Sequence, residues 1–304
     1  MEDVLVQPVE KVKKDSFFKN LKTYLAFAIG APALIWQVIF FYVPLATIVF
    51  YSFLNINDHG KIIGFTTGNF LSIAKWSYFL TIFSSIGLAL ITGIISLMIG
   101  FPLSYFIAFR GGKYKTIFLF LLLVPFWTNF LLHIYAWFFV LEKEGFLNTL
   151  LMNLHLIKQP IHFLNSFFSV TLMMVYYYLP FMALPIYSAL ERFDHSLLEA
   201  SLDLGASKFQ TFKRILVPLV LSSIRAGFFL VYIPAFGEFV IPELMGGDKN
   251  FYVGSVVSQF VLGEQTAKLG TAFTVLSIII LIITVGLLYQ AFNIIHRRLT
   301  KGTI

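Results

Sequence analysis

Long stretches without a charged residue alternate with short polar segments along the chain. Five such stretches cover residues 23–57, 76–109, 116–141, 159–190 and 269–296. A helix rises about 1.5 Å per residue and crosses the hydrocarbon core of a bilayer in about 20 residues, so each stretch predicts a transmembrane helix. None of them shows the alternating polarity of a membrane-spanning strand, and all are longer than such a strand.

A sixth apolar stretch, residues 215–241, is interrupted by Arg225. An arginine at the centre of a span costs about 2.5–3.5 kcal/mol on insertion scales, whereas one near the end of a span can extend to the headgroups. We therefore expect an all-α, polytopic membrane protein with six transmembrane helices.

Composition agrees with a membrane protein and excludes several kinds of site. Hydrophobic residues make up 58% of the chain and charged residues only 12%, with a mean hydropathy of +0.84, whereas soluble domains carry about 25% charged residues. The chain has no cysteine, which excludes disulfides, a thiol nucleophile and cysteine-ligated metals. No metal site is predicted.

The distribution of basic residues predicts the orientation. Fifteen lysines and arginines lie in the segment before the first span, between the second and third, between the fourth and fifth, and after the last: Lys11, Lys13, Lys14, Lys19, Lys22, Arg110, Lys113, Lys115, Arg192, Lys208, Lys213, Arg214, Arg297, Arg298 and Lys301. The opposite side has six: Lys61, Lys75, Lys143, Lys158, Lys249 and Lys268. By the positive-inside rule, tail 1–22, segment 191–218 and tail 296–304 are cytoplasmic. These basic residues lie at the ends of spans. The net charge of +7 therefore indicates contact with the membrane surface and not binding of nucleic acid.

The segment "LLEASLDLGASKFQTFKRILVP", residues 197–218, interrupts the apolar pattern. Its apolar residues fall into two groups, Leu197, Leu198, Leu202 and Leu204 before Gly205, and Phe209, Phe212, Ile215 and Leu216 after it. Glycine ends helices because it tolerates positive φ, so the segment predicts two short amphipathic helices that meet at a turn. Glu199 and Asp203 share a face at i,i+4 spacing. Such helices could lie on lipid headgroups or against another subunit.

The same segment resembles the cytoplasmic EAA loop of ABC-importer permeases, whose pattern is E-A-A-x3-G-x9-I-x-L-P. Glu199, Ala200, Gly205, Ile215 and Pro218 match this pattern, while Ser201 replaces the second alanine and Val217 the leucine. The resemblance implies a type I importer permease fold over residues 76–295, with the first helix, 23–57, outside it. It also implies a coupling helix that docks on an ABC ATPase subunit. The residues assigned to that coupling are Glu199, Ala200, Ser201, Asp203, Gly205, Ala206, Ile215 and Pro218.

A second segment, "IPAFGEFVIPELMGGDKNFYVGSVV" at residues 233–257, is similar to spermidine/putrescine permeases. That resemblance implies polyamine import in a bacterial inner (plasma) membrane. It also implies two partners, a second permease chain and an extracytoplasmic polyamine-binding protein.

A path for polyamine cations needs carboxylates and aromatic faces to replace water. Glu238 lies about 20 residues after Pro218, or about 30 Å along a helix, near the expected external mouth. The other path candidates are Glu243, Trp127, Tyr135, Trp137 and Tyr177. The alternatives are an interfacial or helix-capping role for Glu238, a solvated loop for Glu243 and an interfacial aromatic belt for the rest.

No catalytic residue and no bound cofactor are predicted for this chain. It has no G-x-x-x-x-G-K-[ST] phosphate loop, so Mg²⁺-ATP would be bound by the partner ATPase. The alternatives are an ABC permease for another small solute, an ion-coupled secondary transporter and an intramembrane enzyme. A secondary transporter would show inverted repeats, and none is evident. An intramembrane enzyme would need a motif such as H-E-x-x-H or G-x-S-x-G, or aspartates within spans, and the chain has neither.

Overall fold

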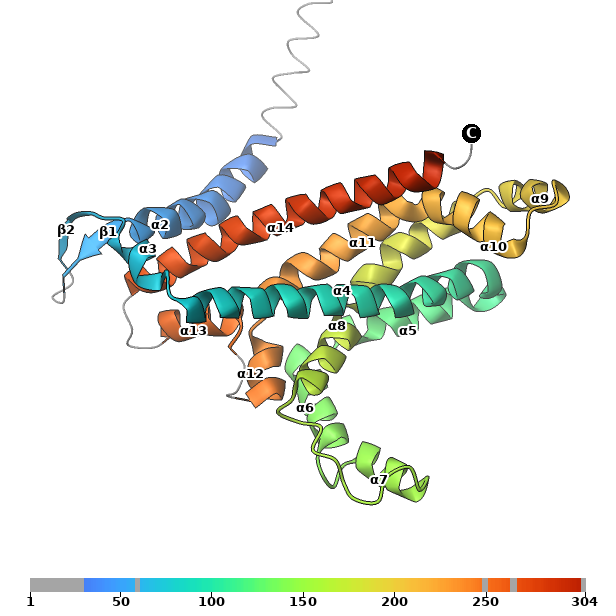
Figure 1. Cartoon of the computed structure of the whole chain (residues 1–304), viewed down its shortest axis with the longest axis horizontal. Helices are drawn as coiled ribbons and strands as arrows, with labels where there is room; N and C mark the ends of the chain where they lie inside the picture. The colour runs from blue at the N-terminus through green and yellow to red at the C-terminus, as the bar shows by residue number, and fades with distance from the viewer. Residues whose placement is uncertain (1–29, 58–60, 248–250, 263–266, 302–304) are drawn as a thin grey trace, which may run out of the picture.

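The computed structural model describes the chain except residues 1–29, 58–60, 248–250, 263–266 and 302–304, so the predicted tail 1–22 lies outside it. Five long helices run through the molecule (Figure 1). They are the helix Gly30–Ser52, which includes α2 (Val43–Ser52), and α4 (Trp76–Arg110), α8 (Phe167–Glu191), α11 (Val217–Gly237) and α14 (Ala267–Lys301). Each is long and apolar enough to cross a membrane. The sixth apolar stretch, 215–241, is helical as far as Gly237, with Arg225 inside α11, and is then interrupted at residues 238–239. The predicted stretch 159–190 is helical only from Phe167.

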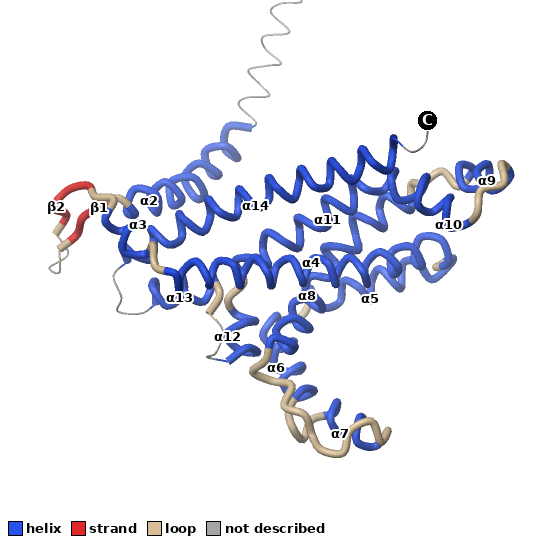
Figure 2. Tube along the Cα trace, in the orientation of Figure 1, coloured by secondary structure: helices blue, strands red, loops and turns tan. Residues whose placement is uncertain are grey.

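Shorter elements connect these helices or follow them at their ends (Figure 2). They are β1 (Leu54–Ile56), β2 (Ile62–Phe65), α3 (Gly68–Ile73), α5 (Lys115–Trp127), α6 (Phe130–Leu141), α7 (Phe146–Asn153), α9 (Ser196–Asp203), α10 (Lys208–Thr211), α12 (Val240–Gly246) and α13 (Val253–Leu262). A 3₁₀ turn, η2 (Gly112–Tyr114), precedes α5.

The first predicted helix is shorter than the charge-free stretch 23–57, because its end belongs to a small hairpin. β1 and β2 pair antiparallel, with Leu54 opposite Phe65. The buried Asn69 side chain of α3 donates hydrogen bonds to the carbonyls of Ser52 and Leu54, at 3.0 and 2.9 Å. These bonds fix the chain where the helix stops. The last helix, in turn, continues to Lys301, through most of the segment predicted as tail 296–304.

The third predicted span is not one straight helix, which corrects the prediction for residues 116–141. The helices before and after Thr128–Asn129 form an angle of 98°. Both residues have extended backbones, and the Asn129 side chain accepts a hydrogen bond from the Leu131 amide at 2.9 Å, so it caps α6. Pro125, which lacks an amide donor, lies just before the break. The described chain therefore has five continuous spans, and six if the bent pair counts as one.

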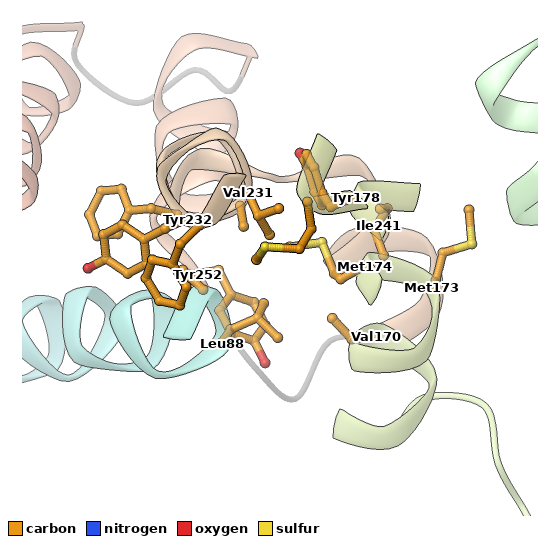
Figure 3. Packing of buried hydrophobic residues seen from close by; sticks show 14 of the residues in the cluster. Leu88, Val170, Met173, Met174, Tyr178, Val231, Tyr232, Ile241 and Tyr252 are labelled. Atoms are coloured by element: carbon orange, nitrogen blue, oxygen red, sulfur yellow. The ribbon is translucent and has the colours of Figure 1, made fainter. Parts of the chain in front are cut away.

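The core is the packing of α4, α8 and α11. Figure 3 shows Val231 and Tyr232 of α11 gathered with Leu88 of α4 and Met174 of α8. The buried face of α4 includes a row of small residues, Ala89, Thr92, Gly93, Ser96, Gly100 and Ser104. Small residues let membrane helices approach closely, where van der Waals packing stabilises them.

Two π-helical turns each end two residues before a proline. The first, η1 (Val38–Tyr42), precedes Pro44, and the second, η3 (Phe212–Leu216), precedes Pro218. Proline cannot donate to the carbonyl four residues earlier, and its ring crowds that carbonyl, so the preceding turn widens. The second of these turns joins α10 to α11.

Candidate functional site

The residues of the EAA-like segment form two short helices that project from one end of the bundle (Figure 1). We call this end, which also carries the C-terminal end of α14, the α9–α10 end. Gly205 has a φ of +83°, and no heavy atom lies within 4 Å of the Cβ that a larger residue would place there. Its amide donates to the Leu202 carbonyl at 2.9 Å, and the Ala206 amide donates to the Ser201 carbonyl at 3.1 Å. The predicted helix–turn–helix is confirmed, with the glycine supplying the left-handed backbone.

Caps define the first turn of each short helix. The Asp194 carboxylate accepts a hydrogen bond from the Ser196 amide at 3.0 Å, before α9. Hydrogen bonds from the Ser196 hydroxyl and then from its amide hold the pKa of Asp194 below its usual value. In α10, Ser207 and Gln210 form a reciprocal capping box.

A buried hydrogen bond joins the two short helices. The hydroxyls of Ser201 on α9 and Thr211 on α10 are 2.9 Å apart, and both residues are buried. Ser201 is the position where the family pattern has alanine. The serine hydroxyl therefore has a structural use, because it fixes α9 against α10.

The outer side of this segment exposes both charge and apolar surface. We call it the α9–α10 surface, and its exposed residues are Glu199, Ala200, Leu202, Asp203, Leu204, Gly205 and Phe209. Leu204 is 89% exposed and Phe209 71%. The sequence pattern grouped Leu204 with the apolar face of the first helix, but the turn at Gly205 directs it outward. Exposed apolar side chains bordered by polar residues are typical of a surface that contacts another protein or the membrane.

The remaining EAA-like residues connect this surface to the bundle. Ala206 is half-buried in the turn, Ile215 is half-buried in η3, and Pro218 is buried in the first turn of α11. At the neighbouring ends of α8 and α5, Lys115 forms an ion pair with Glu191 at 2.9 Å. Along the chain this segment follows α8 and continues through η3 into α11, two of the three core helices.

At the other end of α11 the half-buried Glu238 accepts three hydrogen bonds. Its Oε2 accepts from the Tyr178 hydroxyl at 2.9 Å, and its Oε1 accepts from the amides of Phe239 and Val240 at 3.2 and 3.1 Å. Two of these donors are the backbone amides at the start of α12. All three donors are neutral, and within the described residues the only ion pair is Lys115–Glu191. The negative charge of Glu238 has no cationic partner there.

Aromatic rings surround Tyr178 and extend away from this carboxylate. Tyr177 lies 5.3 Å from Tyr178 between ring centroids, 4.7 Å from Phe130 and 5.5 Å from Phe126. Phe181 packs at 6.1 Å from Tyr178. Of tyrosines 176–178, all of which could line a cation route, the sequence analysis selected Tyr177, whereas the one that donates to Glu238 is Tyr178.

The other path candidates lie apart from this cluster. Trp127 is 71% exposed and Tyr135 53%, and Glu243 is exposed on α12. Trp137 packs against Tyr176 at 5.5 Å, and the Tyr176 hydroxyl lies 3.0 Å from His133 Nδ1. His133 also contacts the Thr128 hydroxyl, so both of its ring nitrogens have partners. In the part of the chain that the structure describes, no three metal-ligating side chains come together.

Comparison with known proteins decides the family. Residues 100–301 match the family described as "Binding-protein-dependent transport system inner membrane component". The chain belongs to this family. It is 37% identical over 264 residues to the Escherichia coli K12 spermidine/putrescine transport system permease protein PotB, covering 86% of this chain and 96% of that protein. It is 27% identical over 137 residues to PotC, a permease protein of the E. coli spermidine/putrescine transport system, covering 45% of this chain and 50% of PotC.

A solved structure shares the fold. The chain superposes with a TM-score of 0.67 on a bacterial ABC transporter involved in the import of the acidic polysaccharide alginate, at 18% identity, over 94% of this chain and 99% of that one. The fold is therefore that of an ABC type I importer permease, as predicted. With its apolar spans and its family, the chain is a multi-pass inner membrane protein and a transport permease subunit.

Proposed function

We propose that this chain is a permease subunit of an ATP-driven importer of polyamines such as spermidine and putrescine. The observation that carries the proposal is the 37% identity to PotB over nearly the whole of both chains. It is joined by a carboxylate without a cationic partner in the described residues, Glu238, set among tyrosines at one end of the bundle. A site of this kind suits an organic cation.

The α9–α10 surface is proposed as the docking site of a separate ABC ATPase. Leu204 and Phe209 supply apolar area, and the exposed carboxylates of Glu199 and Asp203 flank it. The buried Ser201–Thr211 hydrogen bond keeps the two short helices together, so a displacement of the surface moves both. ATP hydrolysis would take place on that partner with its own Mg²⁺, and this chain would be non-catalytic.

The proposed orientation places the α9–α10 end and both termini in the cytoplasm. The C-terminal end of α14 lies at that end (Figure 1). It carries Arg297 and Arg298, and η3 carries Lys213 and Arg214. A cluster of basic residues at one end of a bundle follows the positive-inside rule. Glu238 would then lie towards the external side, about 30 Å from the start of α11.

Two further partners complete the proposed transporter. The family consists of components of binding-protein-dependent systems, which supports an external protein that delivers the substrate. E. coli has two permease proteins, PotB and PotC, named for one system, and this chain matches both. A second, different permease is therefore proposed to form the other half of the pore.

Uptake by a reconstituted complex tests the proposal. The chain would be assembled in vesicles with its ATPase, second permease and binding protein, and the uptake of labelled spermidine measured with ATP. Excess putrescine should compete, whereas unrelated amino acids and sugars should not. Uptake driven by an ion gradient without ATP would contradict the proposal, and competition by an unrelated solute alone would assign another substrate.

A further inference from the structure

A small cavity lies between α11 and α14, close to the α9–α10 end of the bundle. Its volume is about 280 Å³, and its polar lining comes from Ser222 and Arg225 of α11 and from Asn293 and His296 of α14. Pro218 also lines it, which places it about two helical turns or less from the α9–α10 end. The cavity is near the lower end of the size range of ligand sites.

The guanidinium of Arg225 is held in place in this cavity by neutral groups. One of its terminal nitrogens donates to Asn293 Oδ1 at 2.8 Å, and its central carbon lies 4.5 Å from the centroid of the Tyr289 ring. A guanidinium has five N–H donors. Only one of these has a hydrogen-bond acceptor among the described residues.

Among the described residues, no carboxylate forms an ion pair with this guanidinium. Neither α11 nor α14 contains an aspartate or glutamate, and the ion pair of Lys115 with Glu191 is the only one in the described parts of the chain. A charged arginine within a membrane helix is costly and usually marks a partner. Since the N–H donors of Arg225 outnumber their acceptors in the described residues, the cavity suits an anion and not a polyamine.

We propose that this cavity binds the phosphate of an acidic phospholipid headgroup. The planar guanidinium fork matches two phosphate oxygens, and Tyr289 and Asn293 hold it in one orientation. Basic pockets between transmembrane helices at the cytoplasmic surface are suited to such headgroups. The exposed Lys213, Arg214, Arg297 and Arg298 at the same end would attract acidic lipids to this part of the bundle. The proposal does not depend on the transported substrate.

Thermal unfolding of the complete transporter in mixed micelles tests the proposal. Phosphatidylglycerol is titrated against phosphatidylcholine, and inorganic phosphate is added in a separate series. The variant is Arg225→Gln, and the matched control is Lys113→Gln, which removes a cation that lies over the Tyr114 ring, outside the cavity. We expect phosphatidylglycerol to raise the unfolding temperature of the wild type and the control, and most of that rise to be lost in the variant.

A second variant keeps the proposal testable if Arg225→Gln fails to assemble. Arg225→Lys retains the charge but loses the two-pronged donor geometry, so it should need at least about tenfold more phosphatidylglycerol for half of the effect. If phosphatidylglycerol raises the unfolding temperature of either variant over the same concentration range and by the same amount as in the wild type, the site is excluded. An equal effect of inorganic phosphate would overturn the lipid as its ligand and leave a site for free anions.

Discussion

Glu238 and Ser201 each make a contact in the folded protein that their sequence positions do not reveal. Glu238 is a carboxylate near the end of an apolar stretch. Together with the resemblance to polyamine permeases, this position predicts that it lies on a cation path. The hydrogen bond from Tyr178 could not be foreseen, because it depends on how α8 rotates against α11. Ser201 stands where the family pattern has alanine, a residue of nearly the same size. Only the packing of α10 against α9 shows that the serine hydroxyl bonds to Thr211.

Neutralising Glu238 should reduce polyamine uptake without unfolding the protein. Glu238→Gln keeps one oxygen that can accept from the backbone amides, and its amide nitrogen can donate to the Tyr178 hydroxyl oxygen, but it removes the charge that attracts an ammonium group. We expect at least about tenfold less uptake at low spermidine concentration, corresponding to about 1.4 kcal/mol. Tyr178→Phe is the control, since it removes the neutral donor and keeps the carboxylate. Equal uptake by Glu238→Gln and wild type would remove this residue from the path.

The Ser201–Thr211 hydrogen bond should appear as a coupling energy. In a double-mutant cycle of Ser201→Ala and Thr211→Val, each single change leaves one buried hydroxyl without its partner, and the double change removes both. We expect the effects on the free energy of unfolding to be non-additive by about 1 kcal/mol. Strictly additive effects would show that the two hydroxyls do not stabilise each other.

Among the elements, the long helices were predictable and the breaks were not. The charge-free lengths predicted where helices run, because hydrocarbon permits few alternatives. The 98° bend between α5 and α6 depends on Thr128 and Asn129, two polar residues that the charge count passes over. The β1–β2 hairpin depends on Asn69, which is distant in sequence from the carbonyls that it binds.

The turn between α9 and α10 depends on the left-handed backbone of Gly205. Since nothing crowds the position, Gly205→Ala costs only backbone strain, about 1–2 kcal/mol, which tilts α9. Gly205→Asn is the matched control, because asparagine tolerates this conformation better. We expect the ratio of substrate imported to ATP hydrolysed to fall several-fold for alanine and much less for asparagine. The same ratio for alanine and wild type would contradict a rigid turn as the coupling element.

Close packing of α11 on α8 should be sensitive to one methyl group. A Cβ at Gly227 would lie 2.9 Å from the Met182 carbonyl oxygen, whereas one at Gly286 meets nothing within 4 Å. Gly227→Ala should therefore destabilise the protein by about 1–3 kcal/mol, and Gly286→Ala should be neutral or slightly stabilising. Thermal unfolding in detergent compares the two. A smaller effect at Gly227 than at Gly286 would contradict this packing.

At the scale of the whole molecule, the fold class followed from hydropathy, while the function depended on a resemblance. The length of the charge-free stretches predicts membrane helices but does not distinguish a permease from another transporter. The pattern around Gly205 made that distinction, since it specifies a turn and two helices at one end of the bundle. The proposed mechanism requires that this end of the bundle lie on the cytoplasmic side of the membrane.

Cysteine labelling tests that claim most directly, and the chain has no native cysteine to interfere. Single cysteines would replace Leu204, 89% exposed on the α9–α10 surface, and Ile63, 66% exposed on the hairpin at the other end. A membrane-impermeant maleimide should label Ile63→Cys from outside spheroplasts, and Leu204→Cys only in inside-out vesicles, with protection by the bound ATPase. Labelling of Leu204→Cys from outside, or no protection by the ATPase, would contradict the account.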